Sequence, residues 1–250
     1  MINIGPLTIQ AFSLIILAAA AAAATVTGVL AARVGLSLRR VLDMVILALL
    51  LGIVFARLDF ALNPPPSVRT YYDAAWFYSH IFDFQAGLVA VWNGGMGRAG
   101  ALIGAMAAIA LNVWRDDADW AQWAGPIAWG TLAWFVIAPW ANVTTGHLFG
   151  PPVPWSAAGH PTPVYVSVWA LLTGIAVWTF GRGTQRVPWL IALSLSVGLF
   201  LSDFLRVDMG RVLGLTSLQI TLLAAGIVLA VTFYSEMRRH DRNERADQTI

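Results

Sequence analysis

The residues of this chain best suited to chemistry are arginines, carboxylates and histidines that interrupt or border apolar segments. A glycine-rich turn containing Gly94 and Gly95 runs directly into an apolar stretch that Arg98 opens. The first N–H groups of a helix have no partner within the helix, and together with the helix dipole they favour an anion. An arginine at this position adds a cation that binds phosphate through two hydrogen bonds. The turn and Arg98 therefore predict a site for a phosphate group such as that of a lipid.

Further charged residues lie inside or at the ends of apolar segments, where an ionisable group is expensive and indicates a function by default. Arg57 either extends to lipid headgroups along its apolar stem or holds a phosphate. Asp59 follows it by two residues, so the two side chains point to different sides of a helix. Asp203 and Arg206 are three residues apart and can pair on one helix face. Asp43 lies near the inner end of its apolar segment. Its charge there is explained by contact with water or by capping of the helix.

Two histidines, His147 and His160, fall in a segment rich in proline and glycine. Such histidines are either polar surface or a base beside a membrane site, because imidazole titrates near neutral pH. They are far apart in sequence and have no third ligand at a metal-binding spacing, so we expect no metal site. The chain has no cysteine, which excludes disulfides and thiolate ligands of its own. It also has no recognisable cofactor motif.

These residues must be positioned by membrane-spanning helices. Of the 250 residues, 58% are hydrophobic and 11% are charged, and the mean hydropathy is +0.71. Soluble domains are about 25% charged, so the low charge predicts a polytopic membrane protein of the all-α class. The sequence gives no indication of a nucleic-acid partner. About 20 apolar residues cross the hydrocarbon core as a helix. Seven segments qualify, at residues 7–32, 41–62, 97–114, 121–141, 163–180, 187–205 and 213–234.

The placement of arginine predicts the orientation of these segments. If the N-terminus faces out, ten arginines fall in the inner loops and tail, and three fall in the outer loops. Because basic residues are enriched on the cytoplasmic side, this favours an outer N-terminus and an inner C-terminus. Residues 1–235 form one membrane domain, and residues 236–250 form a polar cytoplasmic tail. The first segment has no basic residues before it, so we interpret it as a retained span and not a cleaved signal peptide.

Two predicted outer segments have distinctive compositions. Residues 63–95 begin with a run of three prolines and continue with many aromatic residues. Because aromatic rings favour the level of the headgroups, we expect an arm that lies in the membrane interface. Residues 142–162 contain prolines and glycines but no arginine, aspartate or glutamate. They predict a compact cap on the outer face.

Several motifs along the chain, taken in order, resemble one family. Residues 4–6 are Ile-Gly-Pro, and residues 92–104 are similar to Trp-x-Gly-Gly-Met-Ser-Phe-His-Gly-Gly-Leu-Ile-Gly. Residues 142–150 resemble the end of a core motif, Asn-Phe-x-Asn-Gly-Glu-x-x-Gly. Residues 160–165 resemble His-Pro-Ser-Gln-Leu-Tyr, and residues 203–206 resemble Glu-Phe-Phe-Arg. These are motifs of the prolipoprotein diacylglyceryl transferases, and the resemblance covers nearly the whole chain.

The resemblance implies a seven-span enzyme of the bacterial inner membrane. Members of that family move the diacylglyceryl group of phosphatidylglycerol onto the cysteine thiol of a lipobox preprotein. A phospholipid and a lipobox preprotein are therefore the implied partners. The implied headgroup-binding residues are those that match the family's motifs, together with the arginines and the glycine turn: Arg57, Gly94, Gly95, Arg98, Gly150, His160, Tyr165, Asp203 and Arg206.

The chain also departs from the family where the chemistry is expected. Ala99 stands where the family has a histidine, Pro139 and Leu199 stand where it has arginines, and His147 stands where it has a glutamate. Phe12 replaces a tyrosine and Thr145 replaces an asparagine.

The transfer needs a base for the thiol and a cation for the departing phosphate. Two hypotheses follow. In an active enzyme, His147 and Asn142 serve the reaction while Arg57 or Arg98 holds the anion. Alternatively, the chain is a non-catalytic member that binds lipid or packs as an accessory subunit of a membrane complex.

Overall fold

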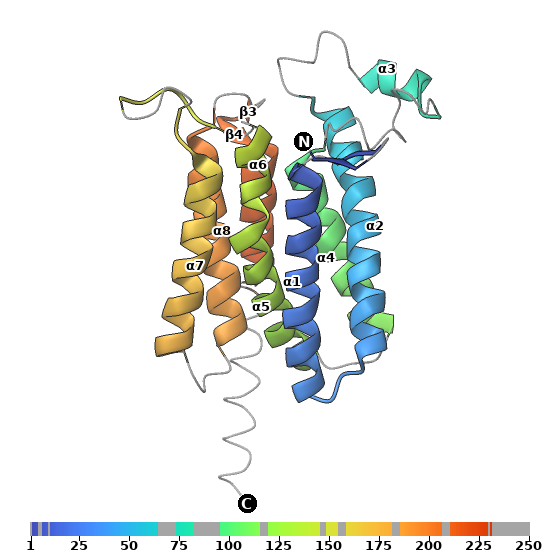
Figure 1. Ribbon diagram of the computed structural model, residues 1–250, viewed down its shortest axis with the longest axis vertical. Coiled ribbons are helices and arrows are strands. Elements are labelled where there is room, and N and C mark those ends of the chain that lie inside the picture. The colour runs from blue at the N-terminus through green and yellow to red at the C-terminus, as the bar shows by residue number, and fades with distance from the viewer. Residues whose placement is uncertain are drawn as a thin grey trace, which may run out of the picture.

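The computed structural model describes residues 2–4, 7–9, 11–64, 74–82, 96–115, 120–145, 149–154, 159–181, 186–206, 211–229 and 231. In this part of the chain the protein is almost entirely helical, with long helices lying side by side (Figure 1). The elements are β1 Ile2–Ile4, β2 Leu7–Ile9, α1 Ala11–Arg33, α2 Leu38–Leu62, α3 Ala74–Ser79, α4 Arg98–Arg115, α5 Trp120–Ile137, α6 Pro139–Thr145, α7 Thr162–Phe180, α8 Val187–Phe204, β3 Arg211–Val212, β4 Leu215–Thr216 and a last helix, Ser217–Leu229.

A helix lies in each of the seven segments that the hydropathy pattern predicts. Five of these helices are long and apolar enough to cross a membrane: α1, α2, the α5–α6 pair, α7 and α8. The other two are the 18-residue α4, which has an arginine at each end, and the last helix, whose described part is Ser217–Leu229. The all-helical prediction is confirmed, apart from two small antiparallel hairpins, β1–β2 and β3–β4.

The helix pair α2–α4 packs closely because α4 presents glycines to α2. A Cβ atom at Gly100 would overlap the main-chain oxygen of Phe55, and one at Gly104 would overlap that of Leu51. Backbones of membrane helices approach closely where small residues line the contact. Helix α5 connects the rest of the bundle, since it packs against α1, α7 and α8. This packing fixes the start of α4, and therefore Arg98, against the end of α2.

The hairpin β3–β4 and helix α3 lie at one end of the bundle, where α2 ends and α4 begins (Figure 1). We call this the hairpin end. Helix α3 is the described part of the predicted arm, and it stands away from the long helices. Its Trp76 stacks on His80 with ring centroids 4.4 Å apart, and Phe82 is highly exposed.

The first residues of the predicted cap segment are helical. Helix α6 continues to Thr145 and includes Asn142. The loop that follows folds back on itself, since the Gly150 N–H donates to the His160 oxygen (2.8 Å) and the His160 N–H donates to the Pro151 oxygen (3.1 Å). Gly159 has a φ of 94°, a left-handed conformation that glycine adopts without strain.

Candidate functional site

A buried carboxylate is the centre of a charged cluster at the hairpin end. Asp203, near the end of α8, has no solvent exposure and pairs with both Arg98 of α4 and Arg206, the latter at 3.3 Å. The Thr216 hydroxyl donates to the second carboxylate oxygen, Oδ2. The predicted pairing of Asp203 with Arg206 is confirmed, and Arg98 joins the pair. We call Arg98, Asp203, Arg206 and Thr216 the Asp203 cluster.

The last helix is capped by the same threonine that bonds to Asp203. The Thr216 N–H donates to Gln219 Oε1 (2.9 Å), and the Gln219 N–H donates to Thr216 Oγ1 (3.2 Å). This is a capping box, which satisfies N–H groups that a helix start leaves without partners. Gln219 also donates from Nε2 to the Phe200 oxygen of α8 (3.1 Å). The sequence signal was present as Thr-x-x-Gln at residues 216–219, but its link to Asp203 needed the structure.

The start of α4 is capped from another helix. Asp59 of α2 accepts the Gly100 N–H at 2.9 Å, and the Gly97 N–H donates to the Ala56 oxygen at 2.7 Å. The N–H groups at this helix start and the Arg98 guanidinium were both predicted to bind a phosphate. Each therefore already has a carboxylate partner. Asp59 binds the helix terminus, and Asp203 binds the Arg98 guanidinium. Arg98 keeps 29% of its side chain exposed, so part of it faces the surface of the bundle.

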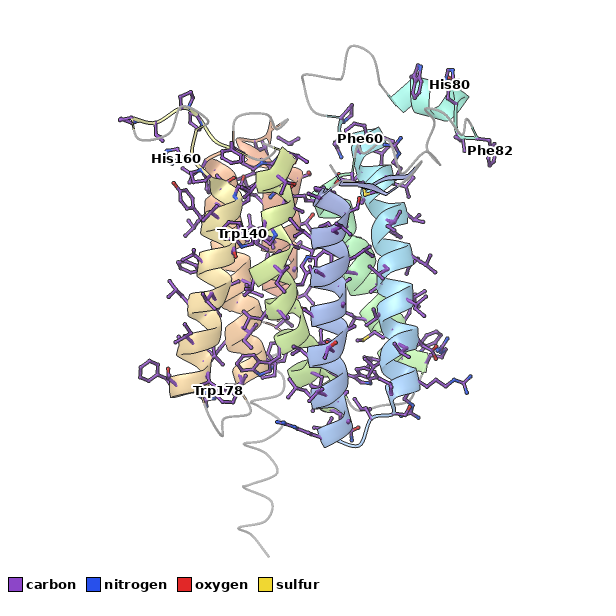
Figure 2. All side chains as sticks on the ribbon, in the orientation of Figure 1. Phe60, His80, Phe82, Trp140, His160 and Trp178 are labelled. Carbon is purple, nitrogen blue, oxygen red and sulfur yellow. The ribbon has the colours of Figure 1, made fainter. Side chains whose placement is uncertain are left out.

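Arg57 lies inside the bundle. Arg57 is only 5% exposed. Its guanidinium carbon lies 5.7 Å from the ring centroid of Phe60, in the geometry of a cation–π contact. An arginine that extends to lipid headgroups keeps its charged end in water. The burial of Arg57 therefore argues against the hypothesis that it extends to the headgroups. Figure 2 shows Phe60 at the hairpin end of α2, the same end at which the Asp203 cluster lies.

Gly150, His160 and Tyr165 come together above the end of α8. A Cβ atom at Gly150 would overlap the Leu205 main-chain oxygen and would lie 3.0 Å from the His160 Cβ atom. The absence of a side chain at Gly150 therefore lets the loop rest directly on the residue before Arg206. His160 Nδ1 lies 3.2 Å from the Tyr165 hydroxyl, which orients the imidazole. Figure 2 shows His160 at the hairpin end of the bundle.

Other predicted site residues are not joined to this cluster. Asn142 is half-buried on α6, where its main-chain oxygen accepts the Thr145 hydroxyl at 3.2 Å. In the described chain no hydrogen bond or ion pair links its side chain to the Asp203 cluster. Gly94, Gly95 and His147 lie outside the described residues. Among the residues that are described, no group of three histidine, aspartate or glutamate side chains is arranged to hold a metal ion.

Among the described side chains at the hairpin end, three arginines, Arg57, Arg98 and Arg206, lie with two aspartates, Asp59 and Asp203. Apolar packing around such groups strengthens the electrostatic interactions between them.

The sequence model of the family described as prolipoprotein diacylglyceryl transferase matches residues 1–235. The chain belongs to that family. The family resemblance predicted from the motifs is thereby confirmed.

Relatives of this prolipoprotein diacylglyceryl transferase family member bear the name phosphatidylglycerol–prolipoprotein diacylglyceryl transferase. The protein of Synechococcus elongatus is 27% identical over 207 residues, which are 75% of this chain and 67% of that protein. The protein of Symbiobacterium thermophilum is 27% identical over 258 residues, which cover 93% of this chain and 91% of the relative. The protein of Thermosynechococcus vestitus is 28% identical over 167 residues, covering 57% and 61% respectively, so the match spans less than two thirds of that relative.

Two of the positions at which this family member departs from the family's motifs pack against each other. Ala99 and Leu199 belong to one buried apolar cluster with Val166, Leu218 and Leu222. Leu199 precedes Asp203 by one helical turn, so this apolar cluster lies on the same face of α8 as the Asp203 cluster. A third departure, Pro139, is buried at the start of α6. Both positions therefore lie in apolar surroundings.

Proposed function

We propose that this protein is an integral membrane transferase that moves the diacylglyceryl group of phosphatidylglycerol to the cysteine thiol of a lipobox preprotein. The observation that carries the proposal is that Arg98 and Arg206 meet at the buried Asp203 in a chain that matches the transferase family over residues 1–235. The names of the relatives supply the two substrates. Phosphatidylglycerol and the lipobox preprotein are then the partners of this site.

In this reaction the thiol sulfur forms a bond to the glyceryl carbon while the bond from that carbon to the phosphate oxygen breaks. The electron pair leaves on the glycerol phosphate, and the thiol proton passes to a base. Cations placed beside the departing phosphate stabilise the charge that develops there. Arg98 and Arg206 serve this role, since Arg98 is partly exposed and Arg206 is held by the same carboxylate. Arg57 adds its charge from α2.

The base that we propose is His147, because imidazole accepts a proton near neutral pH. Asn142, which is half-buried on α6, is proposed to assist it. The glycine turn at Gly94 and Gly95 allows the backbone to approach the headgroup. Gly150, His160 and Tyr165 shape the wall of the headgroup site above Leu205.

We also propose that all seven helical segments cross the bacterial inner membrane, with the N-terminus outside and the C-terminus inside. The ten-to-three distribution of arginines supports this orientation. In this arrangement the hairpin end faces outward. The arm at residues 63–95 lies in the outer interface, the cap follows at residues 142–162, and the tail at residues 236–250 is cytoplasmic.

A second candidate function is lipid binding without transfer, as an accessory subunit of a membrane complex. The specific observation that favours it is the apolar cluster containing Ala99 and Leu199, at positions where the family motif has histidine and arginine. An apolar pair neither accepts a proton nor stabilises an oxyanion. The Asp203 cluster would still bind an anionic headgroup in that case, so binding alone does not separate the two functions.

The test of transfer is complementation of a bacterial strain whose own transferase is repressed. The expected result is restored diacylglyceryl modification of a reporter lipoprotein, detected as a mass increase of its lipobox peptide. Arg206→Gln should abolish the restoration, whereas Arg186→Gln, which removes the same charge at the opposite end, should retain it. If the protein accumulates in the membrane and restores nothing, while the Symbiobacterium relative does, the transferase proposal is wrong and the accessory function is favoured.

A further inference from the structure

A proline interrupts the apolar segment that contains α5 and α6. Helix α5 ends at Ile137, and α6 begins at Pro139. Proline has no N–H to donate to the carbonyl four residues earlier, and its ring clashes with that carbonyl. Beyond the break, the Ala141 N–H donates to the Ala138 oxygen at 3.0 Å, which is the three-residue spacing of a tightened turn. A continuous α-helical hydrogen-bond ladder therefore does not fix the direction of α6.

One hydroxyl on the neighbouring helix α7 contacts both sides of this break. Ser167 Oγ donates to the Val136 oxygen of α5 at 2.5 Å, and it accepts the indole N–H of Trp140 on α6 at 2.9 Å. In membrane helices, serine side chains of neighbouring helices satisfy backbone groups that a proline frees. That task requires the serine alone. Because the same oxygen also binds Trp140, Ser167 joins both α5 and α6 to α7.

The bond to Ser167 also sets the rotation of α6 about its own axis. Ser167 is 5% exposed, whereas Trp140 is 45% exposed. Figure 2 shows Trp140 where α6 and α7 lie side by side. The indole has a donor and no acceptor, so its ring orientation depends on the acceptor that it finds. A rotation of α6 by one residue, about 100°, would carry the indole away from Ser167.

Helix α6 carries the residues that we propose for the transfer of the thiol proton. Asn142 lies within it, and His147 follows its last residue, Thr145, by two positions. Asn142 also follows Trp140 by two residues, which is about 200° around the helix axis. The rotation that brings the indole to Ser167 therefore also determines the side of α6 on which Asn142 lies.

We propose that Ser167 is a positioning residue for the transfer reaction. Through its bonds to Val136 and Trp140 it fixes the direction and the rotation of α6, and with them the place of Asn142 and the point at which the segment containing His147 begins. The inference rests on the proposed function, because it takes Asn142 and His147 as the groups that serve the transfer. Ser167 acts through α6 and leaves the arginines of the Asp203 cluster unchanged.

The first experiment measures kcat and KM for phosphatidylglycerol with the full chain in vesicles. Ser167→Ala removes both bonds and should lower kcat about tenfold, because misplaced reacting groups cost rate. KM should stay within about twofold, since the cations that hold the phosphate are unchanged. Ser167→Thr keeps the hydroxyl and should restore most of the rate. Trp140→Phe removes only the indole N–H and should lower kcat by a smaller factor.

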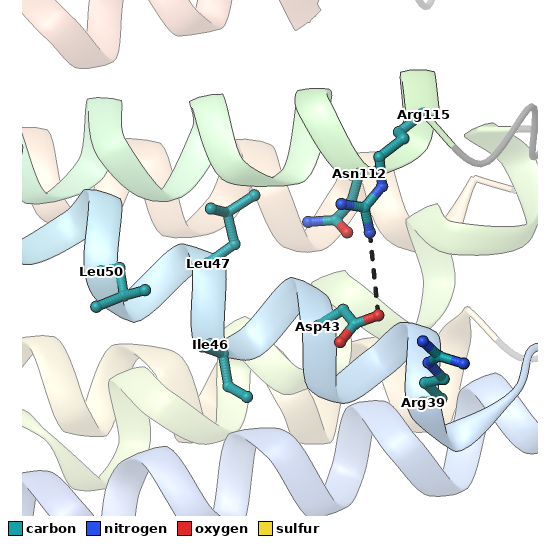
Figure 3. A pocket seen from close by; sticks show the side chains of 7 residues that line it. All are labelled: Arg39, Asp43, Ile46, Leu47, Leu50, Asn112 and Arg115. Carbon is teal, nitrogen blue, oxygen red and sulfur yellow. Dashed lines mark ion pairs between the residues drawn. The ribbon is translucent and has the colours of Figure 1, made fainter.

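Two control variants remove buried polar groups that do not contact α6. Thr173→Val breaks the bond between the hydroxyls of Thr173 on α7 and Ser194 on α8, which are 2.7 Å apart. Asn112→Leu removes a side chain that is 2% exposed and lies beside Arg115 in the last turn of α4 (Figure 3). Both should lower Tm, as Ser167→Ala does, and leave kcat unchanged. An equal loss of kcat in the controls would mean that lower stability reduces the rate, and it would overturn the proposal.

The second experiment reports the position of α6 without using transfer. The chain has no cysteine, so Asn142→Cys introduces a single thiol at a half-buried position. Adding Ser167→Ala should speed its reaction with a maleimide about fivefold, because a loosened α6 exposes the thiol more often. Adding Thr173→Val should leave the reaction rate unchanged.

The labelling separates failure of the inference from failure of the proposed function. A rate of labelling that Ser167→Ala does not change, in a folded protein, would overturn the positioning role. A faster labelling in a protein that shows no transfer would refute the proposed function, and Ser167 would then position α6 for another purpose.

Discussion

Neutralising Asp203 removes the carboxylate that holds two arginines inside the bundle. The Asp203→Asn substitution preserves the shape of the side chain and one oxygen that accepts hydrogen bonds. It nevertheless removes the negative charge that pairs with Arg98 and with the 5%-exposed Arg206, and it weakens the bond from Thr216. Breaking a buried ion pair by removing one partner costs about 3–5 kcal/mol. Because the amide retains an acceptor, we expect about 3 kcal/mol, which lowers Tm by about 6–12 °C in a chain of this size.

The assay is thermal unfolding of the purified protein followed by tryptophan fluorescence. The control is Asp43→Asn, the same substitution in an exposed pair at 3.9 Å from Arg115. Exposed pairs contribute about 0–1 kcal/mol, so the control should change Tm by no more than about 4 °C. Equal shifts for the two variants, or no shift for Asp203→Asn, would show that Asp203 does not organise the hairpin end, and the reasoning that links Arg98 to Arg206 would be wrong.

Three further variants and one control variant, Gly125→Ala, test the packing around the cluster by the same unfolding assay. Gly100→Ala should cost about 1–3 kcal/mol because its Cβ atom would overlap α2, whereas Gly125→Ala, which meets open space, should stabilise α5 by up to about 1 kcal/mol. Thr216→Val should cost about 1–3 kcal/mol because it removes the hydroxyl that bonds to Asp203 and caps the last helix. Ala99→His should destabilise the protein by about 2 kcal/mol and yield no gain in transfer, since its imidazole would enter an apolar cluster; a faster transfer would contradict this.

The helices were predictable because membrane spans leave a strong signal. Each apolar run of about 20 residues contains a helix in the structure, and the arginines at 33, 98 and 115 lie at helix ends. The helical start of the cap segment was not predicted, and Asn142 to Thr145 contain no proline or glycine that would end α6. The small hairpin β3–β4 was missed, since its strands are only two residues long and carry no alternating pattern that sequence periodicity detects.

The candidate site was predicted only in part. The three-residue spacing indicated that Asp203 and Arg206 pair, but nothing in the sequence placed Arg98, 105 residues earlier, on the same carboxylate. The helix dipole and Arg98 predicted a lipid phosphate at the start of α4, and in the structure a carboxylate lies at this helix start. The anion is Asp59 of this chain, which lies 41 residues before Gly100 and reaches it only through the α2–α4 packing. Such long-range pairings depend on how the helices pack against one another. The spacing of residues along the sequence does not predict this packing.

The most direct measurement of the central claim uses vesicles that contain phosphatidylglycerol, a lipobox peptide and the purified protein. Mass spectrometry of the peptide and assay of released glycerol phosphate are made on the same sample. We predict a diacylglyceryl adduct on the cysteine and an equal amount of glycerol phosphate, both lost when Arg98 and Arg206 are replaced by glutamine. An unmodified peptide and no released glycerol phosphate, in vesicles where the Symbiobacterium relative produces both, would contradict the claim.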